Sequence, residues 1–382
     1  MQEWKVPLGD ARVRDEDLST LCDVYRSGWL SMGPRTQELE SALEAYTGAS
    51  HAIAVSSCSA GLHLACVAAG LGPGDRVVLP SNTFVATANA VASCGAEPVF
   101  AEIAGPSEPW LSADAVAEVI DERTRAIFAV CYGGHPGEIE RLRELADDRE
   151  MILLEDAAHG SGAWSGSSHV GTFGLAGALS FSSAKNIGVG EGGMVLTDDP
   201  GVAERLERLR WHGISKSSWG RHRDAVSAYD VTELGFNYRL DDPRAALALA
   251  RLHRLEAETR QRAEVENAYR HDLEQVDGIE PTAPAGPSQR SSHLMFTVTL
   301  ENGIDRDRFR RCLAERGVQT SLHFLPLHRL SLYSRPELEL PRTESYSARA
   351  VTLPLFPRME EWQRELVVEA AAEAIASVQT RR

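Results

Sequence analysis

Short apolar runs alternate with amphipathic helical segments along much of the chain. The apolar runs have the length of buried strands and read HAIAVSS, DRVVLP, AEPVFAEI, TRAIFAV and REMILLEDA. Helical periodicity fills the intervals between them, at 61–69, 85–92 and 139–146. Strands and helices at this spacing indicate right-handed βαβ crossovers and a mainly parallel sheet.

The pattern changes at both ends of this alternating region. Amphipathic helices are expected at 15–27 and 36–46, separated by the turn-prone SMGPR. A long helical pattern rich in Ala, Leu, Glu and Arg runs from 241 to about 273. The breaker-rich PTAPAGPSQ at 281–289 follows it and indicates a change of domain.

The remaining residues predict a smaller α/β unit. HLMFTVTL and VQTSLHF predict strands, and 306–316 and 359–378 predict helices. We therefore expect an α/β fold with a large domain over 1–241, and a smaller C-terminal domain over 242–382 that begins with a long linking helix. In parallel sheets ligands bind beyond the carboxyl ends of the strands, so the candidate chemistry is sought there.

Composition and charge narrow the functional classes. The 382 residues suffice for two domains, and 43% hydrophobic and 25% charged residues are typical of globular proteins. The 55 acidic and 39 basic side chains give a net charge of -16, which argues against nucleic-acid binding. The N-terminus lacks a secretion signal and no run of about 18 apolar residues occurs, so we expect a cytoplasmic protein without membrane contact.

Cysteines and histidines show no short metal-binding spacing. There is no CxxC pair among the six cysteines, which are expected to be reduced and mostly buried. The histidines show no HExxH motif, and we expect no metal.

A lysine follows one expected strand in a segment crowded with small residues, LSFSSAKNIGVGEGGMVLTDD. Its glycines let the backbone approach a bulky ligand, and Lys185 can be partly desolvated there. Desolvation favours the neutral amine that Schiff-base chemistry requires. A solvated loop lysine is equally compatible with this segment alone. GVGEGG matches neither common nucleotide loop.

Two further strand ends carry candidate chemistry. MILLEDAAH ends a buried strand in Glu155 and Asp156, followed by His159. In enzymes that use pyridoxal phosphate (PLP), an aspartate pairs with the protonated pyridine nitrogen, although Asp156 could also cap a helix or form a structural ion pair. In HAIAVSSCSAGLHLA a strand passes through Ser57, Cys58 and Ser59 into a helix, whose N-terminus can bind phosphate. Ordinary serine capping is the alternative.

Together these segments resemble the DegT/StrS family of PLP-dependent aminotransferases, which act mostly on nucleotide-linked keto sugars and in some branches on keto-cyclitols. The resemblance runs nearly end to end, through SGWLSMGP, SSCSAGLHLA, GPGDRVVLPSNTFVATANAV, GAEPVFAEI, LLEDAAH, SFSSAKN, GEGGMV, LRWHG, ELGFNYRLDD, LHFLPLH and TLPLFPRM. It implies a fold-type-I aminotransferase and a homodimer with its active site at the subunit interface.

The resemblance also implies roles for individual residues. Lys185 matches the Schiff-base lysine, Asp156 the pyridinium partner and His159 a contact to the cofactor ring. Matches to the other cofactor contacts, which bind the phosphate or stack on the ring, are Ser57, Cys58, Ser59, Ser180 and Phe84. Asn237 matches a residue that reaches the phosphate from the partner subunit.

Substrate contacts are expected in two places. The segment SKSSWGRHRD offers Lys216, Arg221 and Arg223 for a nucleotide diphosphate and Trp219 for base stacking, although a solvated surface loop fits as well. Candidates elsewhere are Tyr238, Arg239, His323 and His328. The resemblance implies a ping-pong transfer from L-glutamate or another amino acid to the keto group of a nucleotide-linked deoxy sugar, with pyridoxamine phosphate between the two halves.

The sequence departs from the family pattern near the expected cofactor contacts. Cys58 stands where the family has glycine, so the phosphate contact could be weaker, and SFSSAKN replaces the common SFxPTKN. Lys185 argues against the branch that deoxygenates sugars, which carries histidine there. A keto-cyclitol acceptor, a PLP-binding regulator and a PLP lyase remain alternatives. The variants at His159 and in NTFVATANA favour amination at C4.

Overall fold

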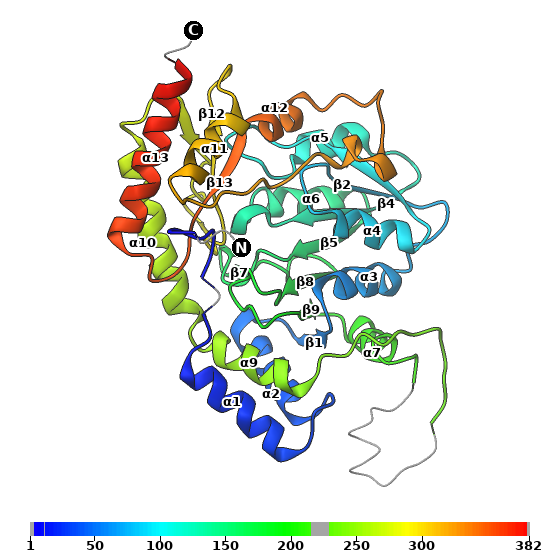
Figure 1. Cartoon of the computed structure of the whole chain (residues 1–382). Helices are drawn as coiled ribbons and strands as arrows, with labels where there is room; N and C mark the ends of the chain where they lie inside the picture. The colour runs from blue at the N-terminus through cyan, green and yellow to red at the C-terminus, as the bar shows by residue number, and fades with distance from the viewer. Residues whose placement is uncertain (1–3, 11, 215–228, 380–382) are drawn as a thin grey trace.

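A seven-stranded sheet forms the centre of the molecule (Figure 1). The computed structural model describes residues 4–10, 12–214 and 229–379. The strands lie in the order β1 (His51–Val55), β9 (Gly193–Thr197), β8 (Ala176–Ser180), β5 (Ile152–Ala157), β4 (Thr124–Val130), β2 (Arg76–Pro80) and β3 (Glu97–Ala101). The strands from β3 to β8 are parallel, whereas β9 runs antiparallel to both β8 and β1. The mainly parallel sheet expected from the sequence is therefore confirmed.

Helices cover both faces of this sheet because successive strand residues point to opposite sides. Val77 belongs to one core and Val78 to the other, and Leu154 and Leu153 divide in the same way. One face is covered by α3 (Cys58–Ala68), α4 (Val85–Ser93) and α7 (Pro200–Leu209). The other face is covered by α2 (Pro34–Thr47), α5 (Ala113–Val119), α6 (Ile139–Asp148) and α9 (Asp242–Leu252).

Local signals fix the ends of these helices. In α2, Pro34 occupies the first turn, where its missing N–H is harmless, and Gly48 ends the helix at φ 78°. Asp241 caps α9 by accepting a hydrogen bond from the N–H of Arg244 at 3.0 Å. The first helix, α1 (Asp15–Ser27), packs against α9.

A second core surrounds a small antiparallel sheet, β10 (Ile279–Pro281), β12 (Phe296–Leu300) and β13 (Ala350–Leu353). Phe296 and Phe309 are buried in this core. The helices that contribute to it are α10 (Leu255–Leu273), α11 (Arg306–Glu315) and α13 (Glu361–Gln379). Further elements are α12 (Pro341–Arg349) and a three-stranded ribbon of β11 (Gln289–Arg290), β6 (Trp164–Ser165) and β7 (Ser168–His169).

The single long linking helix was a wrong prediction, because the chain forms two helices, α9 and α10, over that stretch. Arg254, between them, donates hydrogen bonds to Glu16 at 2.9 Å and Asp17 at 2.8 Å on α1. The interruption stands where the chain leaves the core around Leu252 and enters the core around Leu273. The domain boundary at residue 241 stays a prediction.

The expected strand VQTSLHF was also wrong. Val318 forms an isolated bridge with Val6, and Ser321 forms another with Thr352 of β13. Pairing stays at single residues because the segment passes between two different partners. The extended chain instead carries His323 and Phe324 toward the large sheet.

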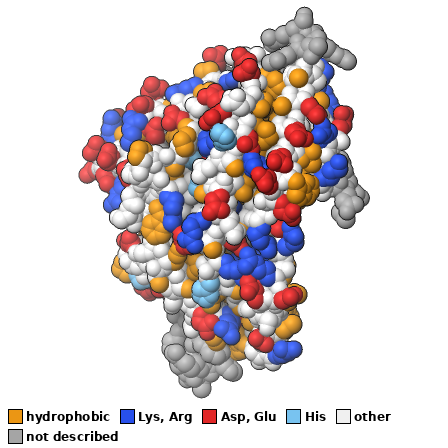
Figure 2. Space-filling view, turned by 90° about the vertical axis from the view of Figure 1, so that its left-hand side faces the viewer, with side chains coloured by type: hydrophobic (Ala, Val, Ile, Leu, Met, Phe, Trp, Pro, Cys, Tyr) orange, Lys and Arg blue, Asp and Glu red, His pale blue; other side chains and the backbone are white. Residues whose placement is uncertain are grey.

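The cysteine thiols and the surface charges can also be compared with the expectations from the sequence. All six cysteines are free, and Cys58, Cys66 and Cys131 are buried. Side chains of both charges are interspersed over the face shown in Figure 2. Within the described ranges, no helix is both long and apolar enough to span a membrane.

Candidate active site

A cavity of about 720 Å³ lies at the carboxyl ends of the parallel strands. Phe84 follows β2, Cys131 follows β4, Asp156 lies near the end of β5 and Ser180 ends β8. Because these ends meet at one edge of the sheet, residues far apart in sequence line the same space. The expected residues that line it are Ser57, Cys58, Ser59, Phe84, Asp156, His159, Ser180, Lys185 and His323.

Lys185 lies in a tight loop that follows β8. Its N–H donates to the Ser182 carbonyl at 2.8 Å, and the side-chain amide of Asn186 donates to the carbonyls of Ser161 and Ser292 at 3.2 and 2.8 Å. Burial lowers the pKa of the Lys185 amine, and the charge of Asp156 opposes that effect. No hydrogen bond or ion pair holds the amine within the described part of the chain. The loop therefore presents a desolvated, unengaged amine.

Asp156 is a buried carboxylate held in one orientation. It accepts hydrogen bonds from the Thr87 hydroxyl at 2.6 Å and from the N–H of Ala158 at 3.1 Å. Burial raises its pKa, whereas these two bonds and the charge of Lys185 oppose the rise. No cationic side chain lies within ion-pair distance of Asp156 among the described residues. A ligand that carries a positive charge would complete this site.

His159 is neutral and oriented by the backbone. The N–H of Gly133 donates to its Nδ1 at 3.1 Å, which places the ring proton on Nε2. Burial lowers its pKa well below the usual value, and the charges of Lys185 and His323 lower it further. Phe324 stacks on the ring with centroids 6.2 Å apart and planes at 25°. His159 can therefore donate a hydrogen bond or cover one face of a flat ligand.

The start of α3 faces the cavity. Ser57 caps the helix by accepting a hydrogen bond from the N–H of Ala60 at 3.1 Å, and Ser59 is exposed to the cavity. A helix N-terminus stabilises a partly buried anion by up to about 2 kcal/mol. A Cβ at Gly193 would lie 2.8 Å from the N of Cys58, so glycine is required for β9 to pack there.

Cys58 fits this corner without backbone strain. It lies in the first turn of α3, and its thiol donates to the Ala178 carbonyl of β8 at 3.5 Å. The backbone φ of Cys58 is not positive. The side chain thus packs toward the sheet, and the backbone at the expected phosphate contact stays helical.

Two aromatic rings border the cavity. Phe84 precedes α4 and is 57% exposed, so its ring is open to a ligand. Phe324 lies 6.0 Å from Phe84 between centroids and connects it to the ring of His159. His323 donates to or accepts from the Thr352 hydroxyl at 2.8 Å, and burial lowers its pKa to about 4.

Other expected residues are not among those that line this cavity. Tyr238 approaches His63 at 3.3 Å, and the Arg239 guanidinium lies 5.4 Å from the Trp211 ring centroid. Asn237 accepts a hydrogen bond from Arg239 at 3.1 Å. The expected substrate contacts Lys216, Trp219, Arg221 and Arg223 lie outside the described residues.

His328 does not line the cavity, which corrects its expected substrate contact. Its ring joins the Ser81 hydroxyl at 2.7 Å to Glu344 at 2.9 Å, and the side chain is fully buried. This network fastens the segment after β2 to the segment after Phe324. His328 therefore has a structural position behind the site.

Three residues that sequence reasoning missed also contribute to the site. Thr87, which orients Asp156, lies in the first turn of α4, and its only sequence signal is a polar side chain one turn beyond Phe84. Phe324 lies within the quoted LHFLPLH without a distinguishing feature. Arg262 lines the cavity from α10, where its sequence signal is that of any helical arginine.

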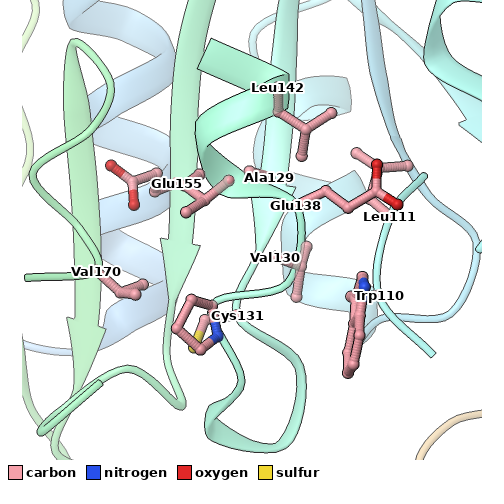
Figure 3. A pocket seen from close by; sticks show the side chains of 11 residues that line it. Trp110, Leu111, Ala129, Val130, Cys131, Glu138, Leu142, Glu155 and Val170 are labelled. Carbon is pink, nitrogen blue, oxygen red and sulfur yellow. The ribbon is translucent and has the colours of Figure 1, made fainter. Parts of the chain in front are cut away.

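Glu155 has its own environment on the other side of β5. It lines a small cavity of about 10 Å³ with Cys131 and Val170, as Figure 3 shows. Its carboxylate accepts hydrogen bonds from three backbone N–H groups, those of Gly171 at 2.6 Å, Phe173 at 2.7 Å and Gly174 at 2.9 Å. Glu155 thus holds the turn that leads into β8.

We expect Glu155→Gln to lower the free energy of unfolding by about 3 kcal/mol, because an amide leaves buried N–H groups without an acceptor. Burial raises the pKa of Glu155 to about 7, so denaturant unfolding is measured at pH 8, where the wild-type carboxylate is ionised. Glu144→Gln, on the exposed face of α6, is the matched control. Equal midpoints for the two variants would contradict the assigned role.

The donor set suits one kind of ligand better than a metal ion. In the described ranges, no three His, Cys, Asp or Glu side chains gather as metal ligands. The cavity instead combines the N-terminus of α3, an unpaired buried carboxylate, two aromatic rings and a desolvated amine. A flat heteroaromatic aldehyde with a phosphate group has the complementary charges and shape.

The sequence matches one family of known enzymes over nearly its whole length. The model of the DegT/DnrJ/EryC1/StrS aminotransferase family matches residues 11–372. The chain belongs to this family. It is therefore an aminotransferase, as the sequence resemblance implied, and solved structures of family members share its fold.

Three solved structures illustrate the similarity of this aminotransferase to known enzymes. TlmJ from Streptoalloteichus hindustanus is 32% identical, with a TM-score of 0.91 and coverage of 99% of this chain and 100% of TlmJ. DesV from S. venezuelae, solved with a ketimine intermediate, is 34% identical, with a TM-score of 0.88 and coverage of 96% and 98%. PseC from Helicobacter pylori, involved in pseudoaminic acid biosynthesis, is 25% identical, with a TM-score of 0.90 and coverage of 98% and 100%.

Proposed function

We propose that this aminotransferase uses PLP to move an amino group from L-glutamate to the keto group of a nucleotide-linked deoxy sugar. The observation that carries the proposal is the convergence of a desolvated Lys185 amine, the unpaired Asp156 carboxylate and the start of α3 in one cavity. The structural similarity to PseC, an aminotransferase of pseudoaminic acid biosynthesis, supports a sugar acceptor.

Different residues of this chain would bind different parts of the cofactor. Ser57, Ser59, Ser180 and the N–H of Cys58 would bind its phosphate, and Lys185 would form the covalent attachment. Asp156 would pair with the ring nitrogen, with Phe84 and His159 bordering the ring. When bound, PLP supplies an electron sink for the negative charge that develops at the substrate α-carbon.

The remaining chemistry falls to groups that the structure already orients. Lys185, once displaced by the donor amine, would act as the base that takes the proton from the α-carbon of the donor and would deliver that proton to the former aldehyde carbon of the cofactor. Thr87 and the N–H of Ala158 hold the Asp156 carboxylate in place during that transfer. Donor and acceptor use one cavity in turn, which is the arrangement that a ping-pong reaction requires.

The proposal includes a homodimer whose active site lies at the interface. The N–H of Ser56 donates to the Tyr238 carbonyl at 2.7 Å, and Val55 bridges Arg239, so the segment around Asn237 is fixed beside the start of α3. A two-fold contact at this segment would bring Asn237 of one subunit to the phosphate site of its partner. This assembly would make a monomer inactive.

The visible absorption spectrum of the purified protein tests the proposal. We expect a cofactor band that changes when L-glutamate is added, with 2-oxoglutarate released, and that is restored by a keto-sugar nucleotide. A spectrum that ignores every amino donor would favour a PLP-binding regulator. Release of ammonia without an acceptor would favour a lyase, and restoration by a keto-cyclitol alone would replace the sugar assignment.

A further inference from the structure

A buried arginine in the cavity wall lacks a partner. Arg262 lies in the middle of α10 and lines the cavity together with Leu294 and His323. The residue is 8% exposed, and within the described ranges it makes no hydrogen bond or ion pair. In contrast, Arg254 and Arg270, which flank it along the chain, each bind a carboxylate.

An unpaired guanidinium is costly in such a place. Buried charges in proteins are paired, because their desolvation is otherwise uncompensated. Burial lowers the pKa of Arg262 to about 10, which leaves it charged at neutral pH. Glu258, the acidic residue that opposes this shift, is already bound to Arg14 and lies 3.7 Å from Arg254. The position calls for an anion from outside the described chain.

The amino-acid donor carries a suitable anion. Its carboxylate is attached to the carbon that reacts at Lys185, so both groups must fit into one cavity. Among the described residues of the cavity wall, Lys185 is the only lysine and Arg262 is the only arginine. A guanidinium matches the planar carboxylate with paired hydrogen bonds. The expected phosphate site is already supplied by α3 and Ser180.

We propose that Arg262 binds the α-carboxylate of the amino-acid donor, an inference that rests on the amino transfer proposed above. The test compares L-glutamate with 4-aminobutyrate, which lacks only the α-carboxylate. In Arg262→Met, the half-saturating L-glutamate concentration should rise about 100-fold, since removing one member of a buried charge pair weakens binding strongly. The response to 4-aminobutyrate should stay within about twofold of wild type.

Two variants serve as controls. Arg260→Met changes an exposed arginine on the same helix and should behave as wild type. Arg262→Lys keeps the positive charge but lacks the paired N–H donors of the guanidinium. It should recover part of the lost binding of L-glutamate. Cofactor uptake and native mass are measured in every sample, because a structural arginine would alter them.

The outcomes separate this proposal from the function on which it rests. Unchanged L-glutamate saturation in Arg262→Met would overturn it, as would an equal loss with 4-aminobutyrate or a loss confined to the keto-sugar half-reaction. A wild-type enzyme that binds PLP but ignores L-glutamate contradicts the proposed function instead. Calorimetry with maleate, a dicarboxylate that needs no turnover, then decides: equal affinity for wild type and Arg262→Met excludes the carboxylate site.

Discussion

Replacing Lys185 with alanine is expected to reduce amino transfer by at least about 10⁴-fold, because this one residue has two roles, proton transfer and covalent attachment of the cofactor. General acid–base catalysis alone contributes about 10²- to 10⁴-fold, and the covalent attachment of the cofactor is lost as well. The measurement is the single-turnover rate with L-glutamate, together with borohydride reduction and mass spectrometry of the reduced protein.

The control for this variant is Lys5→Ala, which removes an exposed lysine that is not among the residues lining the cavity. It should retain both turnover and the reducible adduct. An adduct that persists in Lys185→Ala would place the attachment on another residue, and near-normal turnover would exclude Lys185 from proton transfer.

Asp156→Ala should give the second large loss, because it removes the only carboxylate proposed to pair with the cofactor ring nitrogen. Breaking a buried charge pair costs about 3 to 5 kcal/mol, which corresponds to a decrease in kcat of roughly 10²- to several 10³-fold. We expect the cofactor still to bind through the start of α3. Turnover is measured at saturating donor, so that weaker substrate binding does not contribute.

Thr87→Val is the graded control for this carboxylate. It keeps Asp156 and removes the hydroxyl that donates to it at 2.6 Å. A decrease of about tenfold is expected, since a hydrogen bond to a charged group contributes about 1.5 to 3 kcal/mol and the Ala158 N–H remains. Asp156→Ala turnover within twofold of wild type would show that the ring nitrogen has another partner.

The large sheet could be predicted because its strands are short apolar runs bounded by turn residues. Lys185 and Asp156 could be singled out for a related reason, since each stands just beyond or near the carboxyl end of such a run. Their approach to each other follows from the meeting of parallel strand ends at one edge. Local pattern and topology thus agree over this half of the chain.

Contacts between distant residues explain what could not be predicted. No glycine or proline marks the interruption between α9 and α10, whose Arg254 binds Asp17, 237 residues away. The segment around Val318 has the apolar alternation of a strand, but its bridging partners belong to different parts of the molecule. Arg262 resembles its neighbour Arg260 in sequence, and only burial distinguishes them.

The adjacent carboxylates of β5 also determine how that strand is aligned with its neighbours. Leu153 and Leu154 face different cores, so a slip by one residue that put Leu153 in the place of Leu154 would keep a leucine in that core. The same slip would put Leu154 in the place of Glu155, which leaves three N–H groups without their acceptor. It would also put Glu155 in the place of Asp156, with a longer side chain in the cavity. The polar residues at the end of β5 therefore fix the register of this strand. A misaligned molecule would retain most of its core and lose its chemistry, so specific activity reports strand alignment more sensitively than compactness does.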